Sequence, residues 1–288
     1  MVNPWARRRR EVAERARRAL QDQAVEADLV IPEGPAEVAT GVRAGIEAGR
    51  RRFMAVGGDG TVNLVVDALL RHPWPEPPVL AILPAGSGSD LLRTFAIPQQ
   101  MERAAVHLRG EQTYLADVGV LEGAWGRRHF LNVAQAGIGA ATVETAERLP
   151  RRLGARRYLL SFWMTLPGFR RTEIELQAGA RAYRGAATNV VLANAQYFGG
   201  GMNIAPRANL VDGRLDIQIF TGPKREAVTL IPRIRRGLHL THPSVRRLSA
   251  EEFTLRSDRP WPVEADGEPV GETPLSGRVL AGAIRLKI

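Results

Sequence analysis

Two glycine-rich loops are the parts of this sequence whose residue types best suit phosphate chemistry. Residues 57–61 read GGDGT after the short strand-like run 52–56, and residues 85–90 read AGSGSD after the apolar run 78–84. A loop between a strand and a helix presents backbone N–H groups and a helix N-terminus to an anion. If the two strands are neighbours in a parallel sheet, both loops lie at one edge, so the pattern predicts a nucleotide site.

Asp59 places a negative charge inside the first of these loops. A carboxylate is tolerated beside phosphate only if a divalent cation bridges the two, or if ribose or other hydroxyl donors satisfy it. We therefore expect Asp59 to serve a magnesium nucleotide and not a bare anion. The alternative is that GGDG is only a tight turn, but the strand before it and the helical pattern after it favour the nucleotide site.

The segment 263–269, VEADGEP, supplies a second carboxylate cluster in Asp266 and Glu268. Asp-Gly is a common hairpin-turn signal, which is the structural interpretation of this tripeptide. Phosphoryl transfer to an alcohol needs positioning, charge neutralisation and an acceptor for the hydroxyl proton. A carboxylate on a rigid turn could accept that proton.

The elements that must position these residues change character along the chain. The first third alternates helical periodicity, in residues 10–24 and 36–49, with short apolar strands, which is typical of a parallel sheet covered by helices. From about residue 113, short strand-like runs are separated by glycine-rich turns, with one helical interruption at 143–166. We expect an α/β domain over 1–115 and an antiparallel β-rich domain over 116–288, whose extreme C-terminus can return to the first domain.

Composition limits the classes of function. The net charge is +10, almost all from arginine, because Lys224 and Lys287 are the only lysines, and this charge favours anionic partners. The absence of cysteine excludes disulfides and thiolate metal sites. No apolar run is long enough to span a bilayer, and the N-terminus has no apolar signal-peptide core, so we expect a cytoplasmic protein.

Five segments in order carry a resemblance to a known family: AVGGDGTVN, LPAGSGSDLLRTFAIP, FLNVAQAGIGA, VVLANAQYFGGGMNIAPRANLVDGRLDI and VEADGE. Together they resemble the diacylglycerol kinase catalytic-domain family, which includes bacterial soluble lipid kinases, sphingosine kinases and ceramide kinases. The resemblance implies an N-terminal domain like those of NAD kinase and phosphofructokinase. It also implies an antiparallel β-sandwich-like C-terminal domain, with ATP between the two.

The resemblance also implies site residues and the cofactors ATP and Mg²⁺. Asp266 is expected to be the general base, with Glu268 assisting through the metal or the hydrogen-bond network. A structural Mg²⁺ is expected on the Asp212 carboxylate and the backbone carbonyls of Asn209 and Arg214. The expected nucleotide-binding residues are Asn3, Gly57, Gly58, Asp59, Gly60, Thr61, Asn63 and Ser87.

The sequence departs from the family pattern in several places. It starts at MVNP, which leaves little of the usual first strand, and WARRRR replaces the usual glycine turn. One hypothesis is that the true start codon lies upstream. Leu64 stands where a glutamate commonly follows GGDGTVN, and Ser87 stands where the family usually has threonine.

Residues 148–171, RLPRRLGARRYLLSFWMTLPGFRR, combine arginines with Leu, Phe, Trp and Met. This mixture suits the headgroup boundary of an anionic bilayer. Two alternatives are a core helix with a solvated basic end and a nucleic-acid contact. Nothing else in the sequence supports base readout, so we expect a peripheral membrane partner and no specific nucleic acid.

The leading prediction is an ATP-dependent lipid kinase that transfers the γ-phosphate to a hydroxyl of a membrane lipid such as diacylglycerol. One alternative is an NAD kinase-like small-molecule kinase, although the Asn-Glu signature of NAD kinases has no counterpart in this chain. Another is a catalytically weak homologue that binds nucleotide or membrane as a regulator. The sequence leaves open the acceptor lipid and the oligomeric state, a homodimer included.

Overall fold

The computed structural model describes residues 1–6, 8–85, 89–150, 153–154 and 156–288. The chain forms two compact units, Met1–Asp117 with Gly282–Ile288 (unit 1) and Val118–Ala281 (unit 2). Strand β16 (Leu275–Lys287) begins in unit 2 and ends in unit 1.

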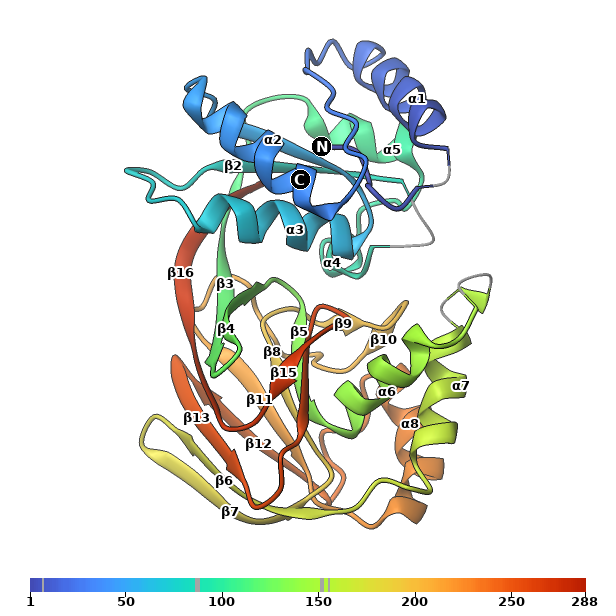
Figure 1. The fold of residues 1–288 in the computed structure, drawn as a ribbon, viewed down its shortest axis with the longest axis vertical. Coiled ribbons are helices and arrows are strands. Elements are labelled where there is room, and N and C mark those ends of the chain that lie inside the picture. Colours follow the sequence, from blue (N-terminus) through green and yellow to red (C-terminus); the bar gives the residue numbers. More distant parts are fainter. Residues whose placement is uncertain (7, 86–88, 151–152, 155) are drawn as a thin grey trace. The chain divides into compact units, whose positions relative to one another are not determined.

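Unit 1 alternates helices and strands along the chain (Figure 1). Its elements are α1 (Arg9–Gln21), α2 (Pro35–Glu47), β1 (Arg52–Gly57), α3 (Asp59–Leu70), β2 (Val79–Pro84), α4 (Asp90–Thr94), α5 (Met101–Ala105) and the 3₁₀ turn η1 (Val106–Leu108). Strand β3 (Tyr114–Gly123) then leaves for unit 2.

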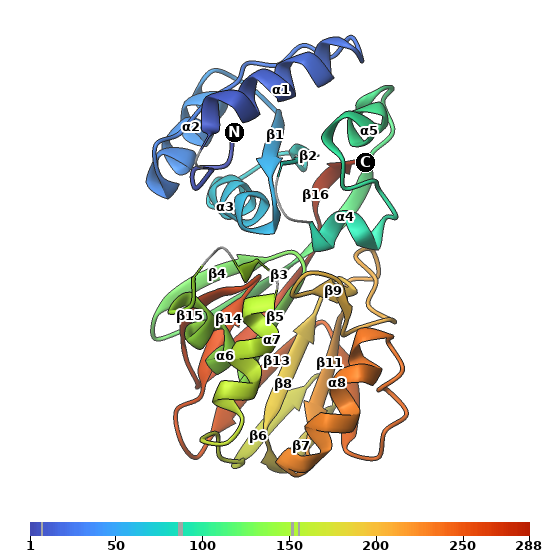
Figure 2. The ribbon, with the colours of Figure 1, turned by 90° about the vertical axis from the view of Figure 1, so that its right-hand side faces the viewer.

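Parallel pairing organises the sheet of unit 1. Strand β1 pairs with β2, and β2 pairs with the end of β16, all in parallel. Val2 forms a further parallel bridge to Val56. Val56 and Leu83 pack with α1 and α5 in one buried cluster. Phe53 lies against Gly45 of α2, which packs on α3, so helices cover both faces of the sheet (Figure 2).

Unit 2 contains two antiparallel sheets. One has the order β16-β13-β6-β7 with β3 and β4 attached, and the other has the order β12-β11-β8-β5-β14-β15. Their further strands are β4 (Gly126–Phe130), β5 (Val133–Gly137), β6 (Thr172–Ala178), β7 (Arg181–Ala187), β8 (Asn189–Ala193), β11 (Leu215–Phe220), β12 (Val245–Ala250), β13 (Glu252–Ser257), β14 (Pro262–Ala265) and β15 (Glu268–Glu272). A small hairpin is formed by β9 (Tyr197–Phe198) and β10 (Met202–Asn203).

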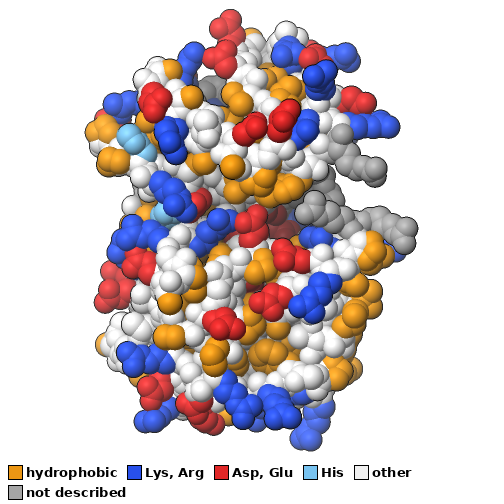
Figure 3. All heavy atoms as spheres, viewed as in Figure 1, with side chains coloured by type: hydrophobic (Ala, Val, Ile, Leu, Met, Phe, Trp, Pro, Cys, Tyr) orange, Lys and Arg blue, Asp and Glu red, His pale blue; other side chains and the backbone are white. Residues whose placement is uncertain are grey.

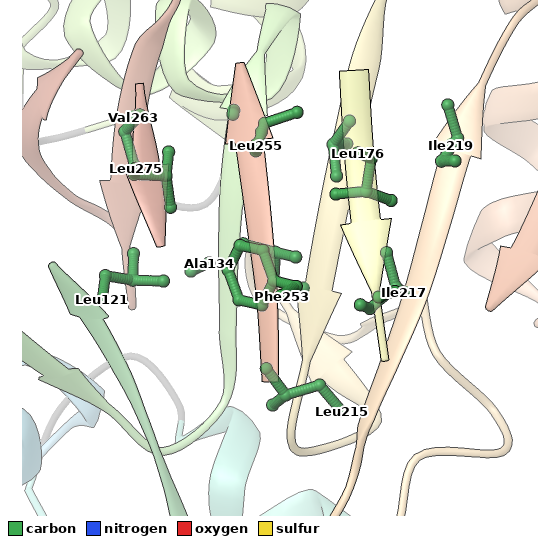
Figure 4. Close-up of a cluster of buried hydrophobic side chains, with 14 of the residues drawn as sticks. Leu121, Ala134, Leu176, Leu215, Ile217, Ile219, Phe253, Leu255, Val263 and Leu275 are labelled. Atoms are coloured by element: carbon green, nitrogen blue, oxygen red, sulfur yellow. The ribbon is translucent and has the colours of Figure 1, made fainter. Parts of the chain in front are cut away.

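The core of unit 2 combines side chains from both sheets (Figure 4). Strand β6 alternates buried and exposed residues, as expected when one face is covered. Strands β8 and β11 are buried along their whole length. Leu192 belongs to the cluster between the sheets, whereas Val191 packs with Leu230 and Ile234 on the opposite face. These two strands therefore read as continuous apolar runs because both of their faces are covered.

The helices of unit 2 are α6 (Ile138–Glu147), α7 (Arg156–Thr165) and α8 (Ala227–Arg235), the last preceded by the 3₁₀ turn η3 (Lys224–Glu226). The single helical segment expected at 143–166 is two helices, with Pro150 and Gly154 (φ +53°) between them. Sequence patterns missed α8, which contains Pro232. Among the described residues, no helix is long and apolar enough to cross a membrane.

The expected fold class is confirmed: parallel strands with helices on both faces in unit 1, and antiparallel sheets in unit 2.

Candidate functional site

The two glycine-rich loops of unit 1 lie at one edge of its sheet. Strands β1 and β2 are parallel neighbours in register, with Gly57 opposite Pro84 at their carboxyl ends. The Ala85 N–H donates to Gly57 O at 3.2 Å, which ties the two loops together. Asn3 lies at the same end, because its N–H donates to Val56 O at 2.9 Å. Its Oδ1 accepts from Trp5 N at 2.8 Å.

The carboxylate of Asp59 accepts hydrogen bonds from residues at the start of α4. Oδ2 accepts from Asp90 N at 2.8 Å, and Oδ1 accepts from Leu91 N at 3.2 Å and from Ser89 Oγ at 3.0 Å. Ser89 is in turn held by the Gln99 amide, whose Oε1 accepts from Ser89 N at 2.6 Å. Backbone N–H groups at a helix start favour a negative charge. The structure thus accounts for the charge inside the loop, and a role of Asp59 towards a magnesium nucleotide stays a prediction.

Two of the predicted nucleotide-site side chains are buried. Thr61 and Asn63, both on α3, are 1% exposed. A Cβ atom at Gly57 would collide with Thr61 Oγ1, so glycine is required there by packing as well as by any phosphate contact. Gly58 caps α3, and Gly60 lies in its first turn. Ser87, also predicted to contact nucleotide, lies outside the described residues.

Asp266 lies in a two-residue hairpin turn between β14 and β15. Ala265 pairs with Glu268, and Asp266 and Gly267 have φ of +49° and +82°, so both lie in the left-handed region that this type of hairpin needs. Asp266 Oδ2 accepts from Leu131 N at 2.8 Å, and Oδ1 accepts from Asn132 N at 2.9 Å and Val133 N at 3.1 Å. The turn is fixed to the β4–β5 connection by these three bonds.

The β4–β5 connection is also held from the other side. Asn194 N and Ala195 N both donate to Asn132 O at 2.9 Å, and Asn194 Nδ2 donates to Leu131 O at 2.9 Å. Asn194 is buried. The contribution of the 131–133 backbone was missed from the sequence, since nothing local marks a partner for Asp266 that is more than 130 residues away in the chain.

The remaining carboxylates of this hairpin differ in their surroundings. Glu268, the predicted assistant of the base, forms an ion pair with Arg128 of β4, a residue that sequence reasoning did not identify. Glu264, also not identified, is 2% exposed and accepts from Gln135 Nε2 at 2.9 Å and from Gly267 N at 2.8 Å. Burial raises the pKa of Glu264 to about 8, against the opposing effect of these two hydrogen bonds.

The predicted metal loop lies at the surface of unit 2, where Asn209, Asp212 and Arg214 are exposed. Asp212 Oδ1 accepts from Arg214 N at 3.1 Å, and Asn209 Oδ1 accepts from Val211 N at 3.3 Å. Within the described part of the chain, no three His, Cys, Asp or Glu side chains cluster as a metal site would require. One carboxylate and two carbonyls are an all-oxygen donor set, which suits a hard cation if water completes it.

Each of the two units contains most of a segment that matches a known protein-family model. Residues 1–121 match the family model described as the diacylglycerol kinase catalytic domain, and residues 132–288 match the model described as the YegS C-terminal NAD kinase beta sandwich-like domain. A "Probable lipid kinase YegS-like" of Cronobacter sakazakii is 27% identical over 273 residues, covering 93% of this chain and 88% of that protein. A "Probable lipid kinase YegS" of Escherichia coli O1:K1 is 26% identical, covering 82% and 77%.

Solved structures share the fold. The "Crystal structure of a putative diacylglycerol kinase from Bacillus anthracis str. Sterne" superposes with a TM-score of 0.79 at 22% identity, covering 99% of this chain and 94% of that one. A further structure from the same organism gives a TM-score of 0.72 at 20% identity.

Proposed function

The chain belongs to the diacylglycerol kinase catalytic-domain family of lipid kinases, and from this premise we propose that it transfers the γ-phosphate of ATP to a hydroxyl of a membrane lipid. The observation that carries the proposal is the Asp266 turn, where three backbone N–H groups hold a half-buried carboxylate in one orientation. In unit 1, the two loops at the carboxyl edge of the sheet are the candidates for the phosphate contacts.

The proposed reaction assigns Asp266 as the proton acceptor. The lipid hydroxyl oxygen attacks the γ-phosphorus, its O–H proton passes to the Asp266 carboxylate, and the bond from that phosphorus to the bridging oxygen breaks, which releases ADP. The three N–H donors keep the carboxylate from rotating, so its orientation towards an incoming hydroxyl is fixed. On the same hairpin, Glu268 forms an ion pair with Arg128, which holds this second carboxylate two residues after Asp266.

Mg²⁺ would supply charge neutralisation on the phosphates when bound with ATP. At the separate surface loop, Asp212 with the carbonyls of Asn209 and Arg214 would hold a structural cation. Because Asp212 Oδ1 already accepts an N–H within its own turn, that loop is formed by the chain itself, and the cation would add to its rigidity.

The lipid acceptor requires contact with a membrane, and α7 is the proposed docking element. Within this helix, all of whose residues are described, Ser161 alone is buried. Leu160, Trp163 and Met164 are 47%, 40% and 55% exposed, so the core-helix alternative does not describe them. Residues 148–171 contain no Asp or Glu. An exposed apolar face next to arginines suits an anionic bilayer surface.

The position of α7 within unit 2 supports this proposal. The Tyr158 hydroxyl lies against the Asp266 turn, 3.8 Å from where a Cβ of Gly267 would be. Arg157 donates to that hydroxyl at 2.9 Å. Hydrophobic side chains gather along the right-hand edge of Figure 3, over the region where Figure 1 shows α7. A lipid entering at α7 would therefore arrive beside the proposed base.

Phosphate transfer from γ-labelled ATP with Mg²⁺ to a mixed lipid extract tests the proposed function. The proteins compared are the wild type, Asp266→Asn and a control, Glu272→Gln, which changes an exposed carboxyl on the same hairpin. Labelled lipid is expected with the wild type and the control, and a loss of about 10²–10⁴-fold with Asp266→Asn. Chromatography of the product identifies the acceptor. ATP binding without any labelled lipid from the wild type would overturn the proposal in favour of a regulatory binding protein.

A further inference from the structure

Glu264 is a buried carboxyl that the proposed chemistry does not use. It lies on β14, two residues before Asp266, and is 2% exposed. In the sheet it is opposite Gln135 of β5. Carboxyl groups are rarely buried unless they are hydrogen-bonded, so its contacts indicate what it does.

A chain of hydrogen bonds runs from the Asp266 turn through Glu264 to the start of α6. Gly267 N donates to Glu264 Oε2 at 2.8 Å, and Gln135 Nε2 donates to Glu264 Oε1 at 2.9 Å. Asn189 Nδ2 donates to Gln135 Oε1 at 2.9 Å, and Gly139 N donates to Asn189 Oδ1 at 2.9 Å. Four elements of unit 2 (β5, β8, β14 and α6) are joined by these bonds.

The donor-to-acceptor direction of the hydrogen bonds in this chain depends on Glu264. Both ends are backbone N–H groups, Gly267 and Gly139, which can only donate. Each amide in between accepts on one side and donates on the other, so one member must accept from both neighbours, and that member is Glu264. A carboxyl can do this whether it is ionised or protonated, because its O–H oxygen keeps a lone pair, whereas an amide nitrogen accepts no hydrogen bond. An amide at position 264 would leave two donors facing each other at one link, even if Gln135 and Asn189 both flipped.

The last member of the hydrogen-bond chain, Gly139 at the start of α6, also leaves room for these side chains. A Cβ atom at Gly139 would collide with Gln135 Oε1 and come within 3.1 Å of Asn189 Oδ1. Glycine at the start of α6 therefore leaves the room that the two amide side chains occupy. This steric requirement is independent of the hydrogen bonds themselves.

The Asp266 turn needs such support. Asp266 adopts φ +49°, a conformation that costs free energy for a residue other than glycine and persists where its surroundings fix it. The 131–133 backbone holds the carboxylate, and Glu264 holds the N–H of the next residue, Gly267. A small displacement of a reacting group is enough to slow catalysis about 100-fold.

We propose that Glu264, together with Gln135 and Asn189, is a positioning residue that fixes the Asp266–Gly267 turn for proton transfer. This inference rests on the proposed function of Asp266. Glu264 does not touch the substrate in this account, and its role is to accept two hydrogen bonds that lock the turn.

Exchanging the side chains of Glu264 and Gln135 tests the proposal. Glu264→Gln is expected to lower kcat of lipid phosphorylation about 10- to 100-fold, with KM for ATP unchanged. Gln135→Glu is expected to lower kcat as well, because two carboxyls then face each other. The double variant Glu264→Gln/Gln135→Glu should recover kcat. In it, the carboxylate introduced at position 135 would accept from the amides on both sides, and the amide introduced at position 264 would still accept from Gly267 N.

Two further measurements separate this role from general stability and from the proposed function. Gln218→Met removes a buried amide in a different network of unit 2, and it should lower the melting temperature without lowering kcat. Amide hydrogen exchange of a peptide containing Gly267 should be about tenfold faster in Glu264→Gln and restored in the double variant, whether or not the wild type phosphorylates lipid. Unchanged exchange in the single variant, or no recovery of kcat in the double variant of an active wild type, would overturn the inference.

Discussion

The backbone N–H of Asp90 donates to Asp59 Oδ2 at 2.8 Å, so the carboxylate of the first glycine-rich loop holds the helix that follows the second. The two loops of unit 1 are therefore one hydrogen-bonded assembly and not two separate turns. Any nucleotide contact made by one loop depends on the conformation of the other.

Replacing Asp59 should weaken this assembly. In Asp59→Asn, the new NH₂ group faces either Asp90 N or Leu91 N, which also donate. We expect a loss of about 1–3 kcal/mol in the free energy of unfolding, measured by denaturant titration, and weaker ATP binding by calorimetry. Ser89→Ala removes one donor and a helix cap, so it should cost about 1 kcal/mol. An Asp59→Asn protein as stable as the wild type would contradict this account.

The sequence predicted those features that follow from local pattern. The position of the glycine-rich loops after parallel strands follows from apolar runs and glycines that are adjacent in the chain. The turn at Asp266–Gly267 follows from the Asp-Gly dipeptide, which favours left-handed φ values. The antiparallel strands of unit 2 follow in the same way from short apolar runs between turns.

The missed features depend on contacts between distant segments. Pro232 disfavours a helix, so the sequence around it does not predict one. Helix α8 forms nevertheless because Leu230 and Ile234 are buried against the sheet, and this tertiary packing outweighs the local preference. Glu264 looks like an exposed strand residue until Gln135 is placed opposite it. Arg128 is tied to the site by its ion pair with Glu268, which is 140 residues away in the chain.

If α7 docks on the membrane, changing its exposed apolar side chains should weaken liposome binding while the protein stays folded. The double change Trp163→Ser/Met164→Ser should reduce co-sedimentation with phosphatidylglycerol-containing liposomes about tenfold or more. Trp163 and Met164 are 40% and 55% exposed, so each would lose roughly half of the 1.5–3 kcal/mol that full burial is worth. Because Trp163 also packs edge-to-face on Phe162, stability should fall by about 1 kcal/mol, and the protein should stay folded. Val106→Ser, equally exposed but in unit 1, is the control.

Activity towards a short-chain, water-soluble acceptor should survive this double change, since α7 would be needed only to reach the bilayer. If liposome binding were retained in the double variant, or if it did not weaken with added salt, α7 would not be the docking element.

His239 should make unit 2 sensitive to acid. The ring is buried, stacks on Phe220 and lies 2.9 Å from Gln218 Oε1 through Nε2. Burial lowers its pKa to about 4 from 6.5. Its contribution is therefore complete above pH 6.5 and is lost as pH falls towards 4, by ~1 kcal/mol per pH unit at most. Unfolding of wild type and His239→Asn, compared from pH 7 to pH 4.5, should differ in slope, and parallel curves would contradict the prediction.

Glu264 should have the opposite pH dependence. Burial raises its pKa to about 8 from 4.5, so between these values the folded protein binds a proton that the unfolded chain does not. Stability from this group is complete below about pH 4.5 and is lost as pH rises through 8, again by ~1 kcal/mol per pH unit at most. The contribution of Glu264 to the free energy of unfolding should therefore fall between pH 7 and 8. The difference between wild type and Glu264→Gln separates this contribution from that of the Met1 amino group, whose pKa burial lowers to about 6 and which acts in the opposite direction.

Glu264→Gln removes this slope, because glutamine does not titrate. The measurement is urea unfolding of wild type and Glu264→Gln at half-unit steps from pH 6.5 to 8.5, with Glu272→Gln as the exposed control. We expect the stability difference between wild type and Glu264→Gln to shrink steadily as pH rises, while Glu272→Gln follows the wild type. A constant difference across this range would mean that Glu264 does not change protonation there, so burial would not set its charge state.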